Sequence, residues 1–242
     1  MSIWGKILGG VGGFAIGGPL GAIIGAVAGH AVDRIRTAQS PDSDATKSIA
    51  FTIGVVVLGA KIAKADGAVT RDEVDAFKQV FQVPDHEVGN VARVFDQARK
   101  DSHGFEPYAR QIGETFEGNA AVLEELLYCL SFIARADGIL HPDEVEYLRK
   151  VADIFGLDAT AFERVTAIRT ADKNVDPYRI LGVPPQIDDG ALKTAYRKLV
   201  RENHPDLLTA QGMPEEFIDI ANKKLAAINA AYDQIAAARG LT

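Results

Sequence analysis

The tripeptide His204-Pro205-Asp206 follows a stretch in which basic residues recur at four-residue steps. Residues four apart share one face of a helix, so these side chains should form an exposed positive stripe. Pro205 disfavours helical geometry in the residue before it, so the helix should stop at Asn203 and leave the tripeptide in a rigid exposed loop. Such a positive rod is suited to docking on an acidic protein surface. The stripe consists of Lys193, Arg197 and Arg201, with Lys198 beside them.

The same tripeptide occurs a second time, as His141-Pro142-Asp143, and its context is different. Pro142 suits the first turn of a helix, and Glu144 stands where a capping box needs a carboxylate, so this copy is predicted to cap a helix. Only the C-terminal copy follows a basic amphipathic helix and precedes a long antiparallel partner. The context, and not the three letters, therefore points to function at residues 204–206.

Two acidic corners repeat in the middle of the chain. KIAKADGAVTRDEVDAFKQVF, from Lys61, aligns with FIARADGILHPDEVEYLRKVA, from Phe132, at a constant offset of 71 residues. The pattern favours a purely structural helix corner, in which glycine ends one helix and a capping box starts the next. The alternative is a divalent-cation site where four carboxylates converge, although a calcium-binding EF-hand is excluded because the first two ligand positions lack acidic oxygens. The four carboxylates are Asp66, Glu73, Asp137 and Glu144.

Residues 7–29 carry no charge and place glycine on a four-residue spacing. A helix of that length spans roughly 35 Å, enough to cross a membrane, and in lipid the backbone must bond to itself despite the glycines. We expect a membrane helix whose glycine face allows self-association into a homodimer. A signal peptide, a soluble glycine-rich loop and a turn at Pro19 between two half-helices are the alternatives to one kinked span. The glycine face consists of Gly9, Gly13, Gly17, Gly21 and Gly25.

The composition of the 242-residue chain narrows the function further. A net charge of −7 argues against a polyanion binder, so no nucleic-acid partner is expected. The single cysteine, Cys129, excludes an internal disulfide and a cysteine-based zinc site, and its apolar surroundings predict a buried side chain. No phosphate loop, nucleophile with a base, or complete metal set is present, so the chain should not be an enzyme and should need no cofactor, apart from the cation considered above.

Helical periodicity throughout, with few strand signals, predicts an all-α protein. Polar segments divide it into a membrane segment (1–36), a linker (37–47), a helical domain (48–170), a second linker (171–175) and a C-terminal module (176–242). In that module, Asp188 or Asp189 should cap a helix that runs to about Glu202, and a final helix should run from about Pro214 to Ala238.

Two of these parts resemble known families. The doubled acidic corner is similar to the TerB-like domain, an all-helical family in which metal binding is suspected at the acidic residues. DPYRILGV, AYRKL, HPD and AINAAYDQI together resemble a J domain across residues 176–242. This resemblance implies binding to a DnaK-type chaperone and stimulation of its ATP hydrolysis, although Leu207 stands where many members have lysine. The interaction residues that it implies are Lys193, Tyr196, Arg197, Lys198, Arg201, His204, Pro205 and Asp206.

The order of the parts, from WGKILG to the terminal J domain, resembles the DjlA-type family of membrane-anchored, DnaJ-like co-chaperones of Gram-negative bacteria. The resemblance implies a bacterial inner-membrane protein with both soluble domains in the cytoplasm. Two other hypotheses remain open. One is a metal- or stress-sensing membrane module in which the repeat is the working part, and the other is an envelope scaffold assembled through the glycine face.

Overall fold

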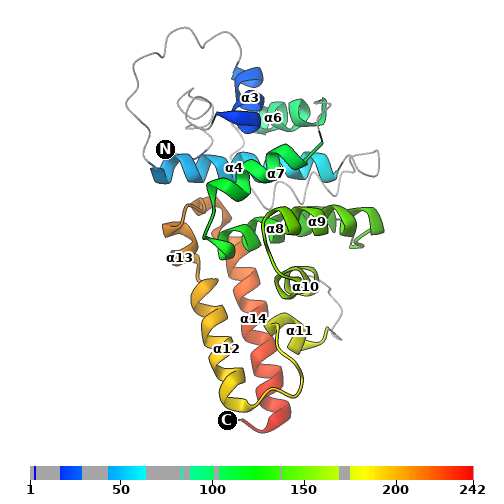
Figure 1. Ribbon diagram of the computed structural model, residues 1–242, viewed down its shortest axis with the longest axis vertical. Helices are drawn as coiled ribbons and strands as arrows, with labels where there is room; N and C mark the ends of the chain where they lie inside the picture. Colours follow the sequence, from blue (N-terminus) through cyan, green and yellow to red (C-terminus); the bar gives the residue numbers. More distant parts are fainter. Residues whose placement is uncertain are drawn as a thin grey trace.

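The computed structural model describes residues 3, 17–28, 43–63, 83, 88–100, 104–136, 138–168 and 175–241. All regular structure in these residues is helical, which confirms the all-α prediction (Figure 1). The first seven of these helices form a bundle: α3 (Gly18–Ala28), α4 (Ser43–Ile62), α6 (Val88–Lys100), α7 (Glu106–Thr115), α8 (Ala120–Ala134), α9 (Pro142–Ile154) and α10 (Ala159–Ile168). The C-terminal module contains α11 (Pro177–Leu181), α12 (Asp189–Glu202), α13 (Pro205–Ala210), the 3-10 turn η3 (Glu215–Phe217) and α14 (Ile218–Arg239).

Helix α4 is the centre of the bundle, with α6, α7 and α8 packed around it. It is apolar on every side, and Phe51, Val55 and Leu58 are fully buried. A helix of this kind is stable in water only when neighbours cover all of its faces. Its residues Asp44–Ile62 are long and apolar enough to cross a membrane, but 72% of that window is buried inside the protein. The burial identifies α4 as the core helix of the bundle.

The glycine-rich segment is described from Gly17 onward, so Gly9 and Gly13 lie outside the described residues. Gly17 and Gly18 have φ values of 57° and 58°, a conformation that glycine adopts at little cost and that interrupts a helix. Helix α3 therefore starts at Gly18 and has 11 residues. At 1.5 Å per residue it is about 16 Å long, shorter than the hydrocarbon core. The residues from 4 to 16 lie outside the described part of the chain, so the choice between one kinked span and two half-helices stays a prediction.

Helix α3 packs on the bundle through Leu20, Ile23 and Ile24, which are buried. Gln111 of α7 joins the two segments, because its Oε1 accepts a hydrogen bond from the Leu20 N–H (2.9 Å) and its Nε2 donates to the Gly17 carbonyl (3.0 Å). Gly17 and Gly25 are exposed, and a Cβ added to either would meet no atom within 4 Å. Gly21, between them on the predicted glycine face, is half-buried, and self-association through this face stays a prediction.

The second acidic corner joins α8 to α9 and behaves as the structural interpretation predicted. Gly138 has a φ of 91°, and Pro142 starts α9 with His141 as its N-cap. The Glu144 carboxylate is directed to the backbone, where its Oε2 accepts a hydrogen bond from the His141 N–H at 2.8 Å.

The predicted cation site lies mostly outside the described part of the chain. Asp66, Glu73 and Asp137, three of its four carboxylates, lie outside the described residues. Among the residues that are described, no three His, Cys, Asp or Glu side chains gather as a metal site requires. Cys129 is fully buried in α8, as predicted.

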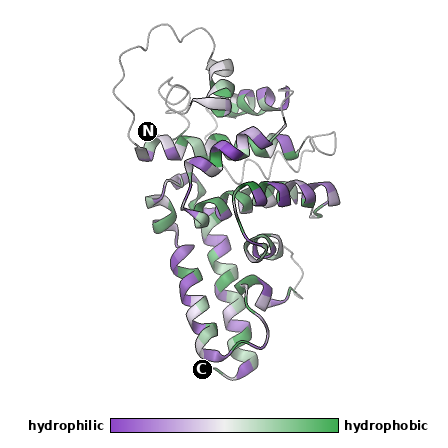
Figure 2. Cartoon of the chain, in the orientation of Figure 1, coloured by the Kyte–Doolittle hydropathy of each residue, from purple (hydrophilic) through white to green (hydrophobic). Residues whose placement is uncertain are grey.

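In the C-terminal module, α12 and α14 form an antiparallel hairpin that extends from the bundle (Figure 1). The predicted cap of α12 is confirmed, because Asp188 Oδ1 accepts a hydrogen bond from the Ala191 N–H at 2.9 Å. Leu192 and Leu199 of α12 are buried against α14, whose inward residues include Ile228 and Ala231. Figure 2 shows hydrophilic residues spaced along α12, as expected for a helix with one face in solvent.

Candidate chaperone-docking site

The tripeptide His204-Pro205-Asp206 forms the start of a helix, whereas the sequence predicted a loop. Helix α12 stops at Glu202 with Asn203 as its C-cap, as expected, but α13 begins at Pro205 with His204 as its N-cap. Proline is favoured at the first helical position because its fixed φ suits the helix and that position needs no N–H donor. The exposed tripeptide is therefore part of a helical turn, where the sequence predicted a loop.

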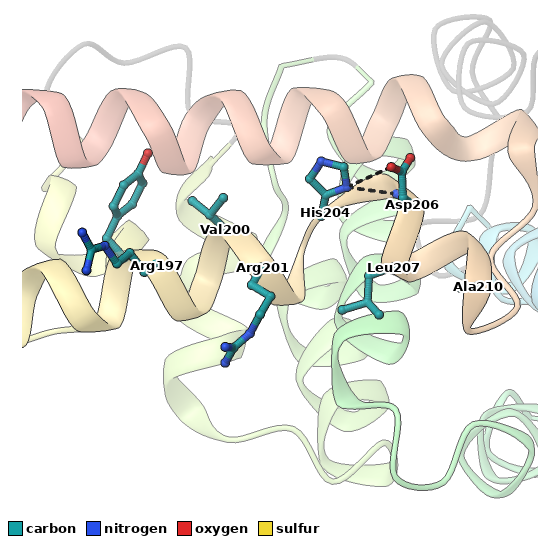
Figure 3. Close-up of a pocket in the computed structure, with 8 residues that line it drawn as sticks. Arg197, Val200, Arg201, His204, Asp206, Leu207 and Ala210 are labelled. Atoms are coloured by element: carbon teal, nitrogen blue, oxygen red, sulfur yellow. Dashed lines mark hydrogen bonds and ion pairs between the residues drawn. The ribbon is translucent and has the colours of Figure 1, made fainter.

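The two polar side chains of the tripeptide point away from the protein. His204 and Asp206 have side chains that are 50% and 93% exposed, and Pro205 between them is buried. The His204 Nδ1 accepts a hydrogen bond from the Asp206 N–H at 3.3 Å and lies 3.7 Å from the Asp206 carboxylate (Figure 3). An imidazole and a carboxylate are thus presented together on one rigid turn.

A shallow groove of about 550 Å³ runs beside the tripeptide (Figure 3). Arg197 and Arg201 supply its positive edge, while Leu207 points into it from α13. Leucine in place of the lysine that many J domains have here makes the groove more apolar and removes one positive charge. Its lining consists of Tyr196, Arg197, Val200, Arg201, His204, Asp206, Leu207 and Ala210.

The structure divides the predicted basic stripe between two faces of α12. Lys193, Arg197 and Arg201 are exposed, and the two arginines border the groove. Lys198 is also exposed but lies on the other edge, where it lines a polar cleft against the bundle and its Nζ is 3.9 Å from Glu202. Lys193, Arg197 and Arg201 therefore follow one exposed side of α12, and Lys198 lies apart from them on the cleft side.

Tyr196 has a structural role as well as a place in the groove. Its ring stacks on Tyr232 with centroids 4.0 Å apart, and its hydroxyl donates a hydrogen bond to Asn229 Oδ1 at 3.0 Å. Burial, with the neighbouring Asp233 carboxylate, raises the pKa of this hydroxyl above its ordinary value. Tyr196 therefore ties α12 to α14 and forms one wall of the groove.

Sequence reasoning missed the apolar part of the groove. Val200 lies one helical turn after Tyr196 and one turn before His204, a spacing that places all three on one side of the chain. That spacing was the available signal. Leu207 and Ala210 could not be placed in the same way, because the short helix α13 that carries them was not predicted.

Three family models match successive parts of the chain. The co-chaperone DjlA transmembrane domain matches residues 1–48, tellurite resistance protein TerB matches residues 52–167, and the DnaJ domain matches residues 176–238. Together with the exposed HPD tripeptide at the end of a basic helix, these matches define a membrane-anchored J-domain co-chaperone. Such proteins are a non-enzymatic family with DnaK-type partners, which confirms the expectation that the chain is not an enzyme.

The match to full-length relatives is more specific than this class. The chain is 29% identical to co-chaperone protein DjlA of Photobacterium profundum, covering 98% of this chain and 99% of that protein. It is also 29% identical to the DjlA of Coxiella burnetii (98% of each chain) and 27% identical to that of Escherichia coli K12 (99% of each chain). No solved structure matches the chain significantly. The chain belongs to the DjlA co-chaperone family.

Proposed function

We propose that this chain stimulates ATP hydrolysis by a DnaK-type chaperone at the cytoplasmic face of the bacterial inner membrane. The observation that carries the proposal is the presentation of His204 and Asp206 on an exposed helical turn, beside an apolar groove with an arginine edge. The fully described J domain provides the whole of this surface.

The docking step is electrostatic. Lys193, Arg197 and Arg201 present positive charge along one side of α12, and an acidic surface on the chaperone would be attracted to it. Complementary charges of this kind accelerate encounter and fix the register of the two surfaces more than they raise affinity. The register then places the HPD turn at the chaperone.

The stimulating step is a shift of population in the partner. A bound protein can favour the hydrolysis-competent state of the chaperone only by binding that state more tightly than the alternative. A rigid turn suits this task because it cannot adapt equally well to both states. Here Pro205 fixes the backbone, and His204 and Asp206 provide the polar contacts.

The cytoplasmic orientation follows from the partner, because the DnaK-type chaperone and its ATP are cytoplasmic. The transmembrane segment shared with the DjlA family anchors the chain to the membrane. We extend the proposal to self-association through the outward glycines of that segment, of which Gly17 and Gly25 are exposed in the structure. This arrangement would hold paired J domains close to the membrane surface.

Single-turnover ATP hydrolysis by the DnaK-type chaperone tests the function directly. The full chain, reconstituted in lipid vesicles, is added at increasing concentration. We expect the hydrolysis rate to rise and then saturate, while the chain alone hydrolyses nothing. A rate that stays at the value of the chaperone alone at every concentration would contradict the proposal.

A further inference from the structure

The segment that follows the HPD turn packs into the bundle and not into the J-domain hairpin. Leu208, Met213 and Phe217 are completely buried and belong to the same apolar cluster as the core helix α4. The Phe217 ring lies 4.8 Å from the ring of Phe51 in α4, at an interplanar angle of 75°. Buried edge-to-face pairs of this kind add to the energy of burial. The end of the J domain nearest the tripeptide is therefore completed by the bundle.

A buried ionic cluster joins the same two parts. Lys224 of α14 is completely buried, and its Nζ lies 3.0 Å from Glu124 Oε1 and 3.3 Å from Glu125 Oε2 in α8. Arg164 of α10 donates two hydrogen bonds to the Glu124 carboxylate, at 2.9 and 3.3 Å. The two positive and two negative charges balance. A buried lysine is costly unless it is paired in this way, so the contact is specific to this docked arrangement.

The electrostatics of the cluster are uneven. Burial alone would raise the pKa of Glu124, but Lys224 and Arg164 outweigh it and hold that pKa below its ordinary value. Burial raises the pKa of Glu125, which Lys224 offsets only in part. Lys224 and Arg164 therefore stabilise the charged form of Glu124, which is the carboxylate nearest to the Lys224 ammonium.

Two glycines show how closely the J domain approaches the bundle. Gly212 has a φ of 108°, and a Cβ added there would lie 2.7 Å from the Lys47 Cβ and 3.3 Å from the Phe116 ring. Gly182, with a φ of 66°, has the Thr160 side chain and Arg164 against it in the same way. Both positions require glycine for their backbone conformation and for space.

The buried residue Leu208 is separated from the HPD tripeptide by one turn of helix α13. The His204 carbonyl accepts hydrogen bonds from the N–H groups of Leu207 (3.0 Å) and Leu208 (3.1 Å). Leu208 is anchored in the bundle while Asp206, two residues earlier, projects into solvent. The direction in which the turn points is therefore set by where the bundle holds α13.

We propose that the bundle positions the HPD turn, with Phe217 and Lys224 as positioning residues of the J domain and Phe51, Glu124 and Glu125 as their counterparts in the bundle. The proposal makes the bundle a working part of the docking site. The effect of the bundle on the chaperone rests on the proposed function, whereas the docking of the J domain on the bundle does not.

Amide hydrogen exchange on the full chain tests the docking. In Lys224→Met, which keeps the side-chain length and removes the charge, the α13 amides of Leu207 and Leu208 should exchange about tenfold faster or more, because a broken buried pair weakens the docked state. Lys100→Met is the control, since Lys100 is an exposed lysine at the end of α6, whereas the neighbouring Lys223 itself lies over the Phe132 ring of α8. The amides of Leu148 and Val151 in α9 report on the bundle itself and should be unchanged.

A second variant keeps the test decisive if Lys224→Met also loosens α9. Gly212→Ala adds one methyl group at the contact with Lys47 and strains the backbone there, so it should speed α13 exchange while α9 stays protected. Wild-type exchange at α13 in Gly212→Ala would overturn the docking.

The same variants are then tested for stimulation of the DnaK-type chaperone, with His204 intact. We expect the half-stimulating concentration to rise about tenfold in Lys224→Met and to stay unchanged in the control Lys100→Met. If α13 exchange accelerates but stimulation equals that of the wild type, the positioning role is wrong. If the wild type does not stimulate at all, the proposed function is wrong and the exchange result still decides the docking.

Discussion

The chain contains the same tripeptide at two helix starts, and the two are nearly identical in backbone. His141 is the N-cap of α9 with φ and ψ of −71° and 151°, and His204 is the N-cap of α13 with −69° and 129°. Proline follows at the first helical position in both. The sequence His-Pro-Asp therefore specifies a local turn, and that turn alone does not create a docking site.

The fourth residue separates the two turns. At the first turn it is Glu144, which is buried and accepts the His141 N–H, so the side chain serves the helix. At the second turn it is Leu207, which lines the groove, and the His204 N–H instead donates to the Arg201 carbonyl at 3.4 Å. Both tripeptides therefore cap a helix, and what separates them is their surroundings, because only the second lies beside the groove.

After the histidine exchange described last, the largest expected effect concerns the aspartates of the two turns. Asp206→Asn should reduce stimulation of the DnaK-type chaperone at least about tenfold, the factor that corresponds to about 1.4 kcal/mol, because the exposed carboxylate is lost from the docking surface. Asp143→Asn should leave stimulation unchanged. Steady-state ATP turnover with each full-length variant measures both, and equal effects would remove the distinction between the two turns.

The basic face is expected to matter next. Arg197→Ala with Arg201→Ala should raise the half-stimulating concentration severalfold at low salt and by less at high salt, because screening weakens the attraction that the arginines supply. Lys198→Ala, on the cleft side of α12, is the matched control and should have a smaller effect. A salt response equal to that of the wild type would argue against electrostatic docking.

Replacing Leu207, the residue after the second tripeptide, by glutamate gives that turn the residue that follows the first tripeptide. Leu207→Glu creates the capping box of the first turn and should stabilise α13, yet it places a negative charge in the groove and should weaken stimulation by a few-fold. Leu207→Lys should instead strengthen binding at low salt. Titrations of the chaperone at two salt concentrations measure these shifts, and a gain in stimulation by Leu207→Glu would contradict the assigned role of the groove.

The smallest expected effect on activity is at Glu144. Glu144→Gln weakens the cap of α9 and should lower the free energy of unfolding by about 1 kcal/mol, with stimulation unchanged. Thermal unfolding followed by circular dichroism, beside the turnover assay, measures the two quantities separately. Lost stimulation in a variant that remains folded would show that the first turn also takes part in docking.

The sequence predicted α12 well because its signals are local. The Asp188 cap, the apolar spacing of Leu192 and Leu199 and the stop before Pro205 all lie within the helix or beside it. Helix α13 was not predicted, because its six residues are too few to be stable alone and depend on Leu208 packing against the bundle.

The junction between the two domains was also not predicted, for a related reason. Glu124 and Glu125 in an apolar helical run, and Lys224 on the long final helix, are separate features in sequence, and only the tertiary fold brings them together. An adjacent pair of carboxylates within an apolar run was the available signal, since buried charges require partners. At the N-terminus, Gly17 and Gly18 adopt positive φ values immediately before Pro19, a local turn that the glycines allow.

The central claim is that the second tripeptide, and not the first, stimulates the DnaK-type chaperone. Changing only its histidine tests this claim most directly. Full-length His204→Gln and His141→Gln are compared with the wild type in the same measurement of ATP turnover by the DnaK-type chaperone. We predict that stimulation disappears in His204→Gln and survives in His141→Gln. Loss in both variants, or in neither, would contradict the account.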